Sequence, residues 1–337
     1  MSAVSAFVML VSAAVPAEAP ATPDGPELIA RIDAALAKVR ARPLSPQIHT
    51  PWAVMHAVIA FGRDARITVD GRPTDAVGWL LHRAEFDGRR IFRPAPGGLE
   101  SWSPGRHFAV QDHPDQYLSV LARAGVRPDD PVTVGDRTYT VADLIGAARL
   151  AVREGREASF TLTAFLILTD PDARWRNAEG EEFDIARLAA METAADVDSA
   201  ACGGTHRLWA LAHACAARRA AGRPMEGVWA EAEAKVRRHT AIALAWQGPE
   251  GYFSAGFSAK AARPRTDAHL LYATGHTLEF LAVACRDDQI RSEPLRRAAA
   301  LTAAKLLEHA DDPAVPDGTR YHAAAALRAY RARLAPR

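Results

Sequence analysis

The sequence predicts an all-α protein, a single (α/α)6 toroid in which inner and outer helices alternate. Apolar periodicity, capping residues and breakers mark twelve helical segments, and no strand-rich block separates them. The segments also alternate in character, because a nearly wholly apolar segment is followed by one with an Arg- or Glu-rich face. A helix that is apolar all round has to be buried, whereas one with a polar face can lie outside.

The two sets of segments follow each other along the whole chain. The expected inner helices are 50–62, 114–124, 159–168, 203–219, 267–285 and 319–333. The expected outer helices are 24–40, 74–84, 140–154, 184–193, 225–246 and 291–309. Three outer helices follow similar segments, 69–76, 134–141 and 178–185, each with a Gly-containing turn and then a Thr or Asp cap. This internal repetition favours a regular architecture.

The N-terminus has the layout of a secretory signal. An apolar run at 6–15 precedes the small-x-small triplet Ala-Glu-Ala at 17–19, and a Pro-rich spacer follows at 20–26. We therefore expect a signal peptide at 1–19, a toroid at 27–334 and a periplasmic or secreted protein; a disordered N-terminus is the alternative. No segment reaches the roughly 20 apolar residues of a membrane span, so none is expected.

Charge and cysteine content exclude further classes. The formal net charge is +1 and the Arg residues are scattered, so nucleic acid is not an expected partner. Three cysteines do not make a disulfide framework. Cys202 and Cys215 are too far apart on one helix to bridge. Cys215 and Cys285 are either bridged or two buried thiols.

Residues 86–112 are rich in Gly, Pro and Arg and are expected to form a loop over the cavity mouth. Irregular stretches of this length inside a compact domain are usually functional. Trp102 and Arg106 lie in it, and we expect them to contact an acidic or sugar-like ligand. A structural plug that closes the ring is the alternative.

Histidines recur near the starts of the inner helices. In a toroid these starts converge on one mouth of the central cavity, where the helix dipoles favour anions and neutral imidazole. The recurring residues are His49, His56, His113, His206, His276 and His322. Helix capping or packing is the alternative role for each of them.

Cys202 and His206 are spaced i, i+4, which predicts one helix face and a shared metal ion. His276 opens the next inner helix and completes a predicted Cys/His zinc site. In the alternative interpretation, Cys202 is a small buried residue before a Gly-Gly turn.

Carboxylate and phenol groups accompany two of the histidines. Glu279 lies three residues after His276 and Tyr272 four before it, and we expect Glu279 to orient His276 unless it pairs with a loop Arg. His113 is followed by Asp115, Gln116 and Tyr117. Such groupings suit general acid–base chemistry. The candidate catalytic residues are His113, His206, His276, Glu279 and His322; the candidate substrate-binding residues are His49, His56, Trp102, Arg106, Gln116 and Tyr272.

The segment QGPEGYFS at 247–254 resembles the helix-stapling turn of the terpenoid cyclase and protein prenyltransferase superfamily, which is built as α/α toroids. HTPW, ACGGTHRLWAL and GHTLEFL resemble exported bacterial members of unassigned activity. The prenyltransferase resemblance implies a zinc site in which Cys202 and His276 match in kind, whereas Ala200 stands where that family has an Asp. D-x-D-D, D-D-x-x-D, G-x-S-x-G and H-E-x-x-H motifs are absent, which argues against prenyl transfer.

Three functional interpretations follow. The first is an extracytoplasmic lyase or hydrolase, with or without zinc, that acts in a His-lined cavity on an anionic polymer or on a small molecule such as a carbohydrate. The second is a non-catalytic ligand-binding protein that uses the same cavity. The third is a scaffold that binds a protein partner through its outer helices.

Overall fold

The computed structural model describes residues 25–86, 88–101, 111–257 and 263–335. This part of the chain is mostly helical, with thirteen α-helices and a few short strands. The predicted signal peptide, Trp102 and Arg106 lie outside the described residues. Among the described helices, none combines the length and apolar character that crossing a bilayer requires.

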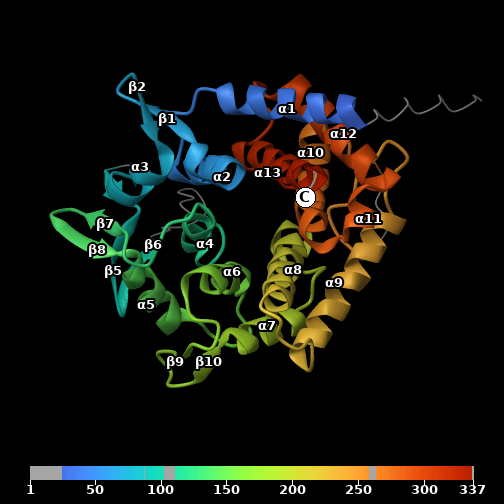
Figure 1. Ribbon diagram of the computed structural model, residues 1–337. Helices are drawn as coiled ribbons and strands as arrows, with labels where there is room; N and C mark the ends of the chain where they lie inside the picture. Colours follow the sequence, from blue (N-terminus) through green and yellow to red (C-terminus); the bar gives the residue numbers. More distant parts are fainter. Residues whose placement is uncertain (1–24, 87, 102–110, 258–262, 336–337) are drawn as a thin grey trace, which may run out of the picture.

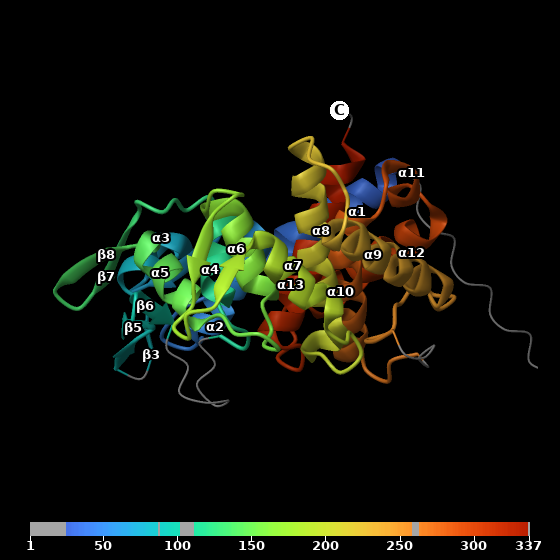
Figure 2. The ribbon, with the colours of Figure 1, turned by 90° about the horizontal axis from the view of Figure 1, so that it is seen from below.

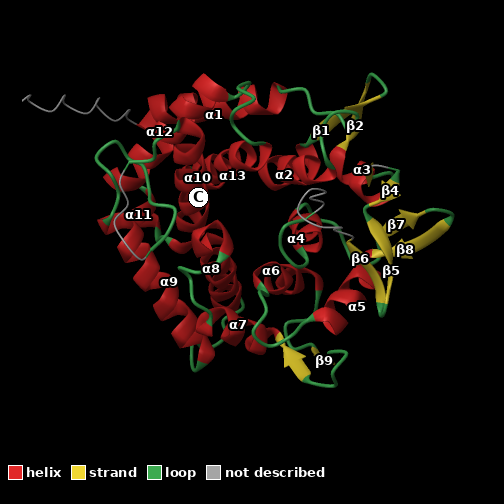
Figure 3. Cartoon of the chain, turned by 180° about the vertical axis from the view of Figure 1, so that it is seen from behind, coloured by secondary structure: helices red, strands yellow, loops and turns green. Residues whose placement is uncertain are grey.

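Six helices surround the centre of the molecule (Figures 1 and 3). They are α2 (Pro51–Phe61), α4 (Gln116–Arg123), α6 (Ser159–Leu168), α8 (Thr205–Ala220), α10 (Asp267–Ala284) and α13 (Asp317–Leu334). Each packs against the next, and α13 packs against α2. Their burial follows from composition, because α2 and α6 carry no charged side chain in their helical spans.

The remaining long helices lie outside these six (Figure 1). They are α1 (Gly25–Ala41), α3 (Ala76–His82), α5 (Val141–Ala151), α7 (Ile185–Ala194), α9 (Val228–Ala245) and α12 (Glu293–His309). A short α11 (Asp287–Ile290) precedes α12. All twelve segments expected from the sequence are therefore helical, although several are shorter than expected at their ends. α1, for example, buries Leu28, Ile32, Ala35 and Val39 on one stripe.

The described residues also form five antiparallel β-hairpins that were not expected from the sequence. Their strands pair as β1 (Arg66–Val69) with β2 (Arg72–Asp75), β3 (Glu85–Phe86) with β4 (Arg89–Arg90), β5 (Phe92–Ala95) with β6 (Gly98–Ser101), β7 (Pro131–Val134) with β8 (Arg137–Thr140), and β9 (Arg174–Arg176) with β10 (Glu182–Asp184). Figure 2 shows β3 to β8 gathered in one half of the molecule and α8 to α12 in the other.

Three hairpins explain the repetition in the sequence. β1–β2, β7–β8 and β9–β10 each lead directly into an outer helix, and the last residue of the second strand is the helix N-cap. Asp75, Thr140 and Asp184 hold these cap positions, so α3 starts after Asp75 rather than at the expected Thr74. The repeated unit is thus a hairpin and a capped helix.

The expectation of an irregular 86–112 stretch is wrong for residues 89–101, which contain β4 and the hairpin β5–β6. Phe92 and Leu99 are buried while their strand neighbours are not, which is the alternation of a half-buried hairpin. Gly98 has a φ of 139°, and a Cβ there would lie 2.2 Å from the carbonyl oxygen of Asp143 in α5. The glycine therefore allows the hairpin to pack directly on α5.

Candidate metal centre

The CGG sequence forms a tight turn in front of α8. Cys202, Gly203 and Gly204 have φ angles of 54°, 62° and 72°, so three successive residues are left-handed. A Cβ on Gly203 would lie 1.6 Å from the carbonyl oxygen of Ala255, which excludes any other residue. The Thr205 hydroxyl donates to the Cys202 carbonyl at 2.7 Å. This turn sets the position of the Cys202 thiol. The prediction that Cys202 lies on one helix face with His206 is therefore wrong.

Five imidazoles meet the thiol at the centre of the molecule, and all five are buried. His206 is central, with ring centroids 4.8 Å from His113, 5.2 Å from His276 and 5.2 Å from His322. The His276 and His322 rings are 4.1 Å apart, and His56 lies 5.1 Å from His322. These five histidines and Cys202 are called the Cys/His cluster below. They come from α2, α8, α10, α13 and the segments before α4 and α8.

Four of the imidazoles are oriented by a bond at Nδ1. His56 Nδ1 donates to the Trp52 carbonyl at 2.7 Å and His276 Nδ1 to the Tyr272 carbonyl at 2.8 Å. The other two donate to carboxylates. His113 Nδ1 lies 2.9 Å from Glu157, and His322 Nδ1 lies 2.8 Å from Glu279. These bonds leave Nε2 as the nitrogen available to the cluster.

His206 differs from the other four. Its two ring nitrogens are buried and have no hydrogen-bond partner apart from the nearby Cys202 thiol, and the residue is only 7% exposed. A buried polar group without a partner costs roughly 1–3 kcal/mol. In a native protein, a bound ion or water usually explains a buried group of this kind.

The potential ligand atoms fall into two trios in which every atom lies within 4.8 Å of the others. The thiol trio is His113, Cys202 and His206, and the imidazole trio is His206, His276 and His322. The predicted trio of Cys202, His206 and His276 is not one of them. His113 completes the trio with the thiol, its Nε2 3.8 Å from Cys202 Sγ, while His206 and His276 also lie near enough to the thiol to lower its pKa.

A third group, Asp267, Glu308 and His309, lies between α10 and α12 and is half-exposed. Lys305 Nζ is 2.9 Å from Asp267 and 2.8 Å from Glu308. Because an ammonium group already neutralises these carboxylates, this group is an ion-pair network rather than a metal site.

Charge differs between the trios. Burial opposes the imidazolium of His113, but hydrogen bonds with Cys202 and Glu157 raise its pKa to about 10. Burial likewise opposes the Cys202 thiolate, yet the charge of His206 and hydrogen bonding from His113 hold the pKa of that thiol far below its usual range. By contrast, burial and the neighbouring imidazoles lower the pKa of His322 well below its usual value.

His56 resembles His322, since burial lowers its pKa to about 4. Without a metal ion, the thiol trio therefore holds a thiolate–imidazolium pair. His322 and His56 are neutral and keep Nε2 lone pairs that a cation can accept as ligands.

The expected partners of His276 and His113 are wrong in detail. Glu279 binds His322 on α13 and not His276, while its other oxygen lies 3.5 Å from Arg123 on α4. The carboxylate beside His113 is Glu157. Nearer in sequence, Asp115 accepts a hydrogen bond from Thr161 at 2.6 Å. His276 is instead held by the Tyr272 carbonyl of its own helix, and His113 by a carboxylate from the segment before α6.

Three candidate substrate-binding residues have structural contacts. His49 is half-buried in the turn before α2, where its ring contacts Ser45, and it lies outside the cluster. Gln116 is buried and accepts a hydrogen bond from the Asp112 backbone. Tyr272 is half-buried, with its ring 4.6 Å from that of His276. Of the three, only Tyr272 contacts the cluster.

Glu157, Arg123 and Phe160 were not expected at the site. The Phe160 ring packs against both the His113 and His206 rings, at 5.0 Å and 5.1 Å. It comes from α6, the inner helix without histidine. A Glu two residues before an apolar helix was the available signal for Glu157, since acidic groups favour helix starts.

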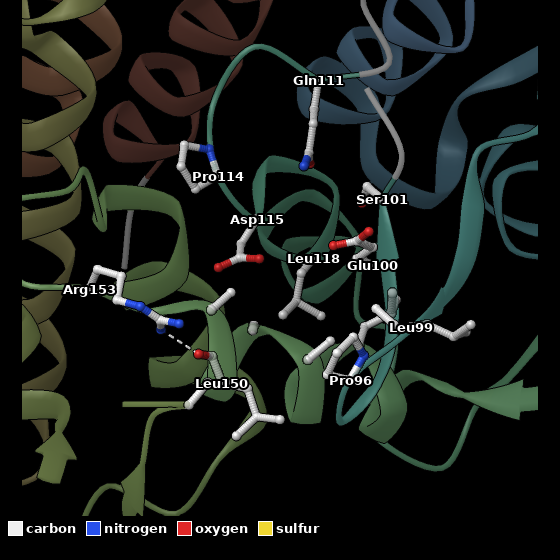
Figure 4. Close-up of a pocket in the computed structure, with 16 residues that line it drawn as sticks. Pro96, Leu99, Glu100, Ser101, Gln111, Pro114, Asp115, Leu118, Leu150 and Arg153 are labelled. Carbon is white, nitrogen blue, oxygen red and sulfur yellow. Dashed lines mark hydrogen bonds between the residues drawn. The ribbon is translucent and has the colours of Figure 1, made fainter. Parts of the chain in front are cut away.

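A pocket of about 320 Å³ lies between the β5–β6 hairpin, α4 and α5, and its lining includes none of the cluster residues. Figure 4 shows the Asp115 carboxylate directed into it, with Glu100 opposite and Leu118 below. Pro114 and Asp115, which follow His113 directly, line its wall. The segment 113–115 therefore contributes residues to both the pocket and the thiol trio.

Cys202, Cys215 and Cys285 are all free, so Cys215 and Cys285 are two buried thiols rather than a bridge. Burial raises their pKa values to about 11 and about 12. No protein-family model, curated protein or solved structure matches the chain. The function therefore has to be inferred from the geometry.

Proposed function

We propose that this chain is a metal-dependent extracytoplasmic enzyme, a lyase or hydrolase whose Cys/His cluster binds an ion of the zinc class. The observation that carries the proposal is the orientation of the imidazoles. Four rings have Nδ1 bonded to a carbonyl or carboxylate and Nε2 left for the cluster, around a fifth ring with no partner apart from the Cys202 thiol. Histidines that bind metals are fixed in this way.

The donor set favours zinc. One thiolate with neutral imidazoles suits Zn²⁺ better than Mg²⁺ or Ca²⁺, which prefer oxygen ligands. A bound Zn²⁺ ion would supply a Lewis acid for a substrate oxygen. Three protein ligands in a trio leave a fourth position for substrate, which is the arrangement of catalytic zinc sites.

The residues around the ion have separate roles in this proposal. Glu157 and Glu279 hold the tautomers of His113 and His322. Burial and the Cys202 thiolate raise the pKa of Tyr272, so its phenol keeps its proton. Cys202 and Tyr272 are the half-buried members of the site. Substrate therefore enters on their side, where Tyr272 can donate a proton to a leaving group.

The arrangement of the helices supports a central cavity whose mouth the cluster residues share. We propose an (α/α)6 toroid, with α2, α4, α6, α8, α10 and α13 as its inner helices, because each packs against the next and α13 packs against α2. The apolar leader at 1–19 supports export. Beside His113, the pocket lined by Asp115 and Glu100 suits a small molecule better than an anionic polymer, because it carries two carboxylates.

Metal analysis of the purified full chain tests the proposal. We expect bound zinc, loss of zinc from a C202S/H206A double variant, and full retention in a C215S variant that removes a buried thiol elsewhere. Activity against a panel of esters, amides and glycosides should disappear with a chelator and return with Zn²⁺. A bound ion without any turnover would favour the non-catalytic binding protein. A wild-type protein that neither carries nor takes up zinc contradicts the proposal.

A second candidate function rests on a different contact. Cys202 Sγ, His113 and Glu157 form a continuous relay, with 3.8 Å between Sγ and Nε2 and 2.9 Å between Nδ1 and the carboxylate. In this case the thiolate attacks a substrate carbonyl carbon, His113 gives its proton to the leaving group, and water then releases the acyl group.

The two candidates respond oppositely to metal. A cysteine hydrolase should be active in chelator, inhibited by Zn²⁺ and inactivated by iodoacetamide. The metal-dependent enzyme should lose activity in chelator, and bound Zn²⁺ should protect its thiol from iodoacetamide. The H322A variant separates them again, because it removes a ligand of the imidazole trio but no member of the relay.

A further inference from the structure

The two trios share one residue. His206 belongs to both the thiol trio and the imidazole trio. Within the described part of the chain, neither His113 nor Cys202 forms a trio with His276 or His322. One ion with bonds of about 2.0–2.3 Å needs ligand atoms within about 4.6 Å of each other. The trios therefore match two ion positions better than one.

His206 has the chemistry of a bridge. Both of its ring nitrogens are buried and without a hydrogen-bond partner apart from the Cys202 thiol. In the other four imidazoles, Nδ1 is held by a carbonyl or carboxylate, so each has one nitrogen left to give. Of the five imidazoles, only His206 has both ring nitrogens available as ligands.

We infer that the Cys/His cluster holds two zinc-class ions bridged by the imidazole ring of His206. This inference rests on the proposed metal-dependent function and adds a second ion to it. The first ion takes Cys202 Sγ, His113 Nε2 and one nitrogen of His206. The second takes Nε2 of His276 and of His322 and the other nitrogen of His206.

Bridging requires one proton to leave. A neutral imidazole carries a single N–H, and that proton passes to solvent when the second nitrogen bonds to an ion. With bonds of about 2.0 Å on each side of the ring, the two ions lie about 6 Å apart. The spacing leaves each ion its own open position.

The two ions are distinguishable by their ligands. The first has a thiolate and the second has nitrogen ligands only. Co²⁺ in the first position therefore gives a thiolate-to-cobalt charge-transfer band, whereas Co²⁺ in the second does not. A variant that removes one pair of ligands should remove one ion and leave the spectrum of the other.

The test is a Co²⁺ and Zn²⁺ titration of metal-free full-length protein, with circular dichroism to confirm folding. Wild type and C215S should bind two equivalents. H113A/C202S should bind one equivalent without the charge-transfer band, and H276A/H322A one equivalent with it. H206A should weaken both equivalents by more than about 100-fold.

Each result decides the matter. One equivalent in wild type overturns the second ion and leaves the proposed function standing, whereas none overturns both. Weakening of only one equivalent in H206A overturns the bridge. If the variants do not fold, anomalous diffraction from wild-type crystals grown with Zn²⁺ should show two peaks about 6 Å apart. A single peak would contradict the inference.

Discussion

The two carboxylate–histidine pairs of the cluster are alike in geometry but differ in the charge of the histidine. Glu157 binds His113 at 2.9 Å and Glu279 binds His322 at 2.8 Å, both at Nδ1. Yet the pKa of His113 is raised to about 10, while that of His322 is lowered well below its usual value. A carboxylate alone therefore does not decide the charge of a histidine.

Burial opposes the imidazolium of both histidines, and the group at the far nitrogen then separates them. His113 Nε2 faces the Cys202 thiolate, which stabilises an imidazolium. His322 faces His276, His56 and His206, whose positive charges would repel its own. A cation should therefore displace the proton of His113 but meet a neutral His322 directly. The following variants separate these two sides, from the largest expected effect to the smallest.

Removal of His206 should have the largest effect because it breaks both trios. We expect H206A to weaken zinc binding by more than about 100-fold, beyond the 10–100-fold loss typical of outer ligand partners. H239A is the matched control: His239 is also buried and also has Nδ1 bonded to a backbone carbonyl, but it lies outside the cluster. Isothermal titration with Zn²⁺ measures both. Equal affinities would contradict the account.

Alkylation should reveal the charge of the thiol trio in metal-free protein. An ordinary thiol gains reactivity by about two orders of magnitude from pH 6 to pH 8, because its pKa is near 8.5. The pKa of Cys202 lies below this range, so the thiolate is present throughout, and its rate should change less than about threefold. Mass spectrometry after iodoacetamide treatment reports the site.

Cys215 and Cys285 are internal controls in the same experiment. Their raised pKa values and burial should keep them unmodified in the folded protein. A steep pH profile at Cys202, parallel to that of a free thiol peptide, would show that no imidazolium faces it.

Neutralising the two carboxylates should sharpen the contrast. E157Q and E279Q should each weaken one ion by about 10-fold, since a glutamine no longer raises the basicity of the ring it holds. E157Q should act on the ion with the charge-transfer band and E279Q on the other. E279Q should also lower the melting temperature more, because it leaves the Arg123 guanidinium without its carboxylate. Identical effects on both ions would argue for one shared site.

Arg123 should show the smallest effect. Its Nη2 lies 3.5 Å from Glu279, and its guanidinium stacks 4.4 Å from the Trp209 ring, so it positions the carboxylate from behind. R123Q should weaken the ion of the imidazole trio by about fivefold, equivalent to roughly 1 kcal/mol, and leave the ion of the thiol trio unchanged. Competition between Zn²⁺ and a chromophoric chelator resolves such a difference. An equal loss at both ions would contradict this role.

Much of the helical layout could be predicted from the sequence, because periodicity and caps act within one helix. The strands could not, since none among the described residues is longer than four residues, and all hairpins except β3–β4 pack on a helix. The hairpin at 92–101 is an example. Its two buried side chains and its glycine contact with α5 are visible only when the helix is in place.

The site followed the same rule. Convergence of helix starts predicted that His49, His113, His206, His276 and His322 would meet, but not their pairing. His49 lies outside the cluster, and His276 reaches it from the middle of α10 rather than from its start. Glu157 lies 44 residues from His113 and Glu279 lies 43 residues from His322, so sequence adjacency pointed to the wrong partners. Cys202 was placed on a helix face, whereas a left-handed turn presents it. Contacts between helices depend on packing that a single sequence does not encode locally.

The most direct test is the zinc content of the full-length wild-type protein after loading with Zn²⁺ and then dialysis into metal-free buffer. We expect zinc to survive this dialysis, with a Kd tighter than about 1 μM, and to be lost from H206A but not from H239A. A wild-type protein that is fully folded by circular dichroism and retains no zinc would contradict the metal centre.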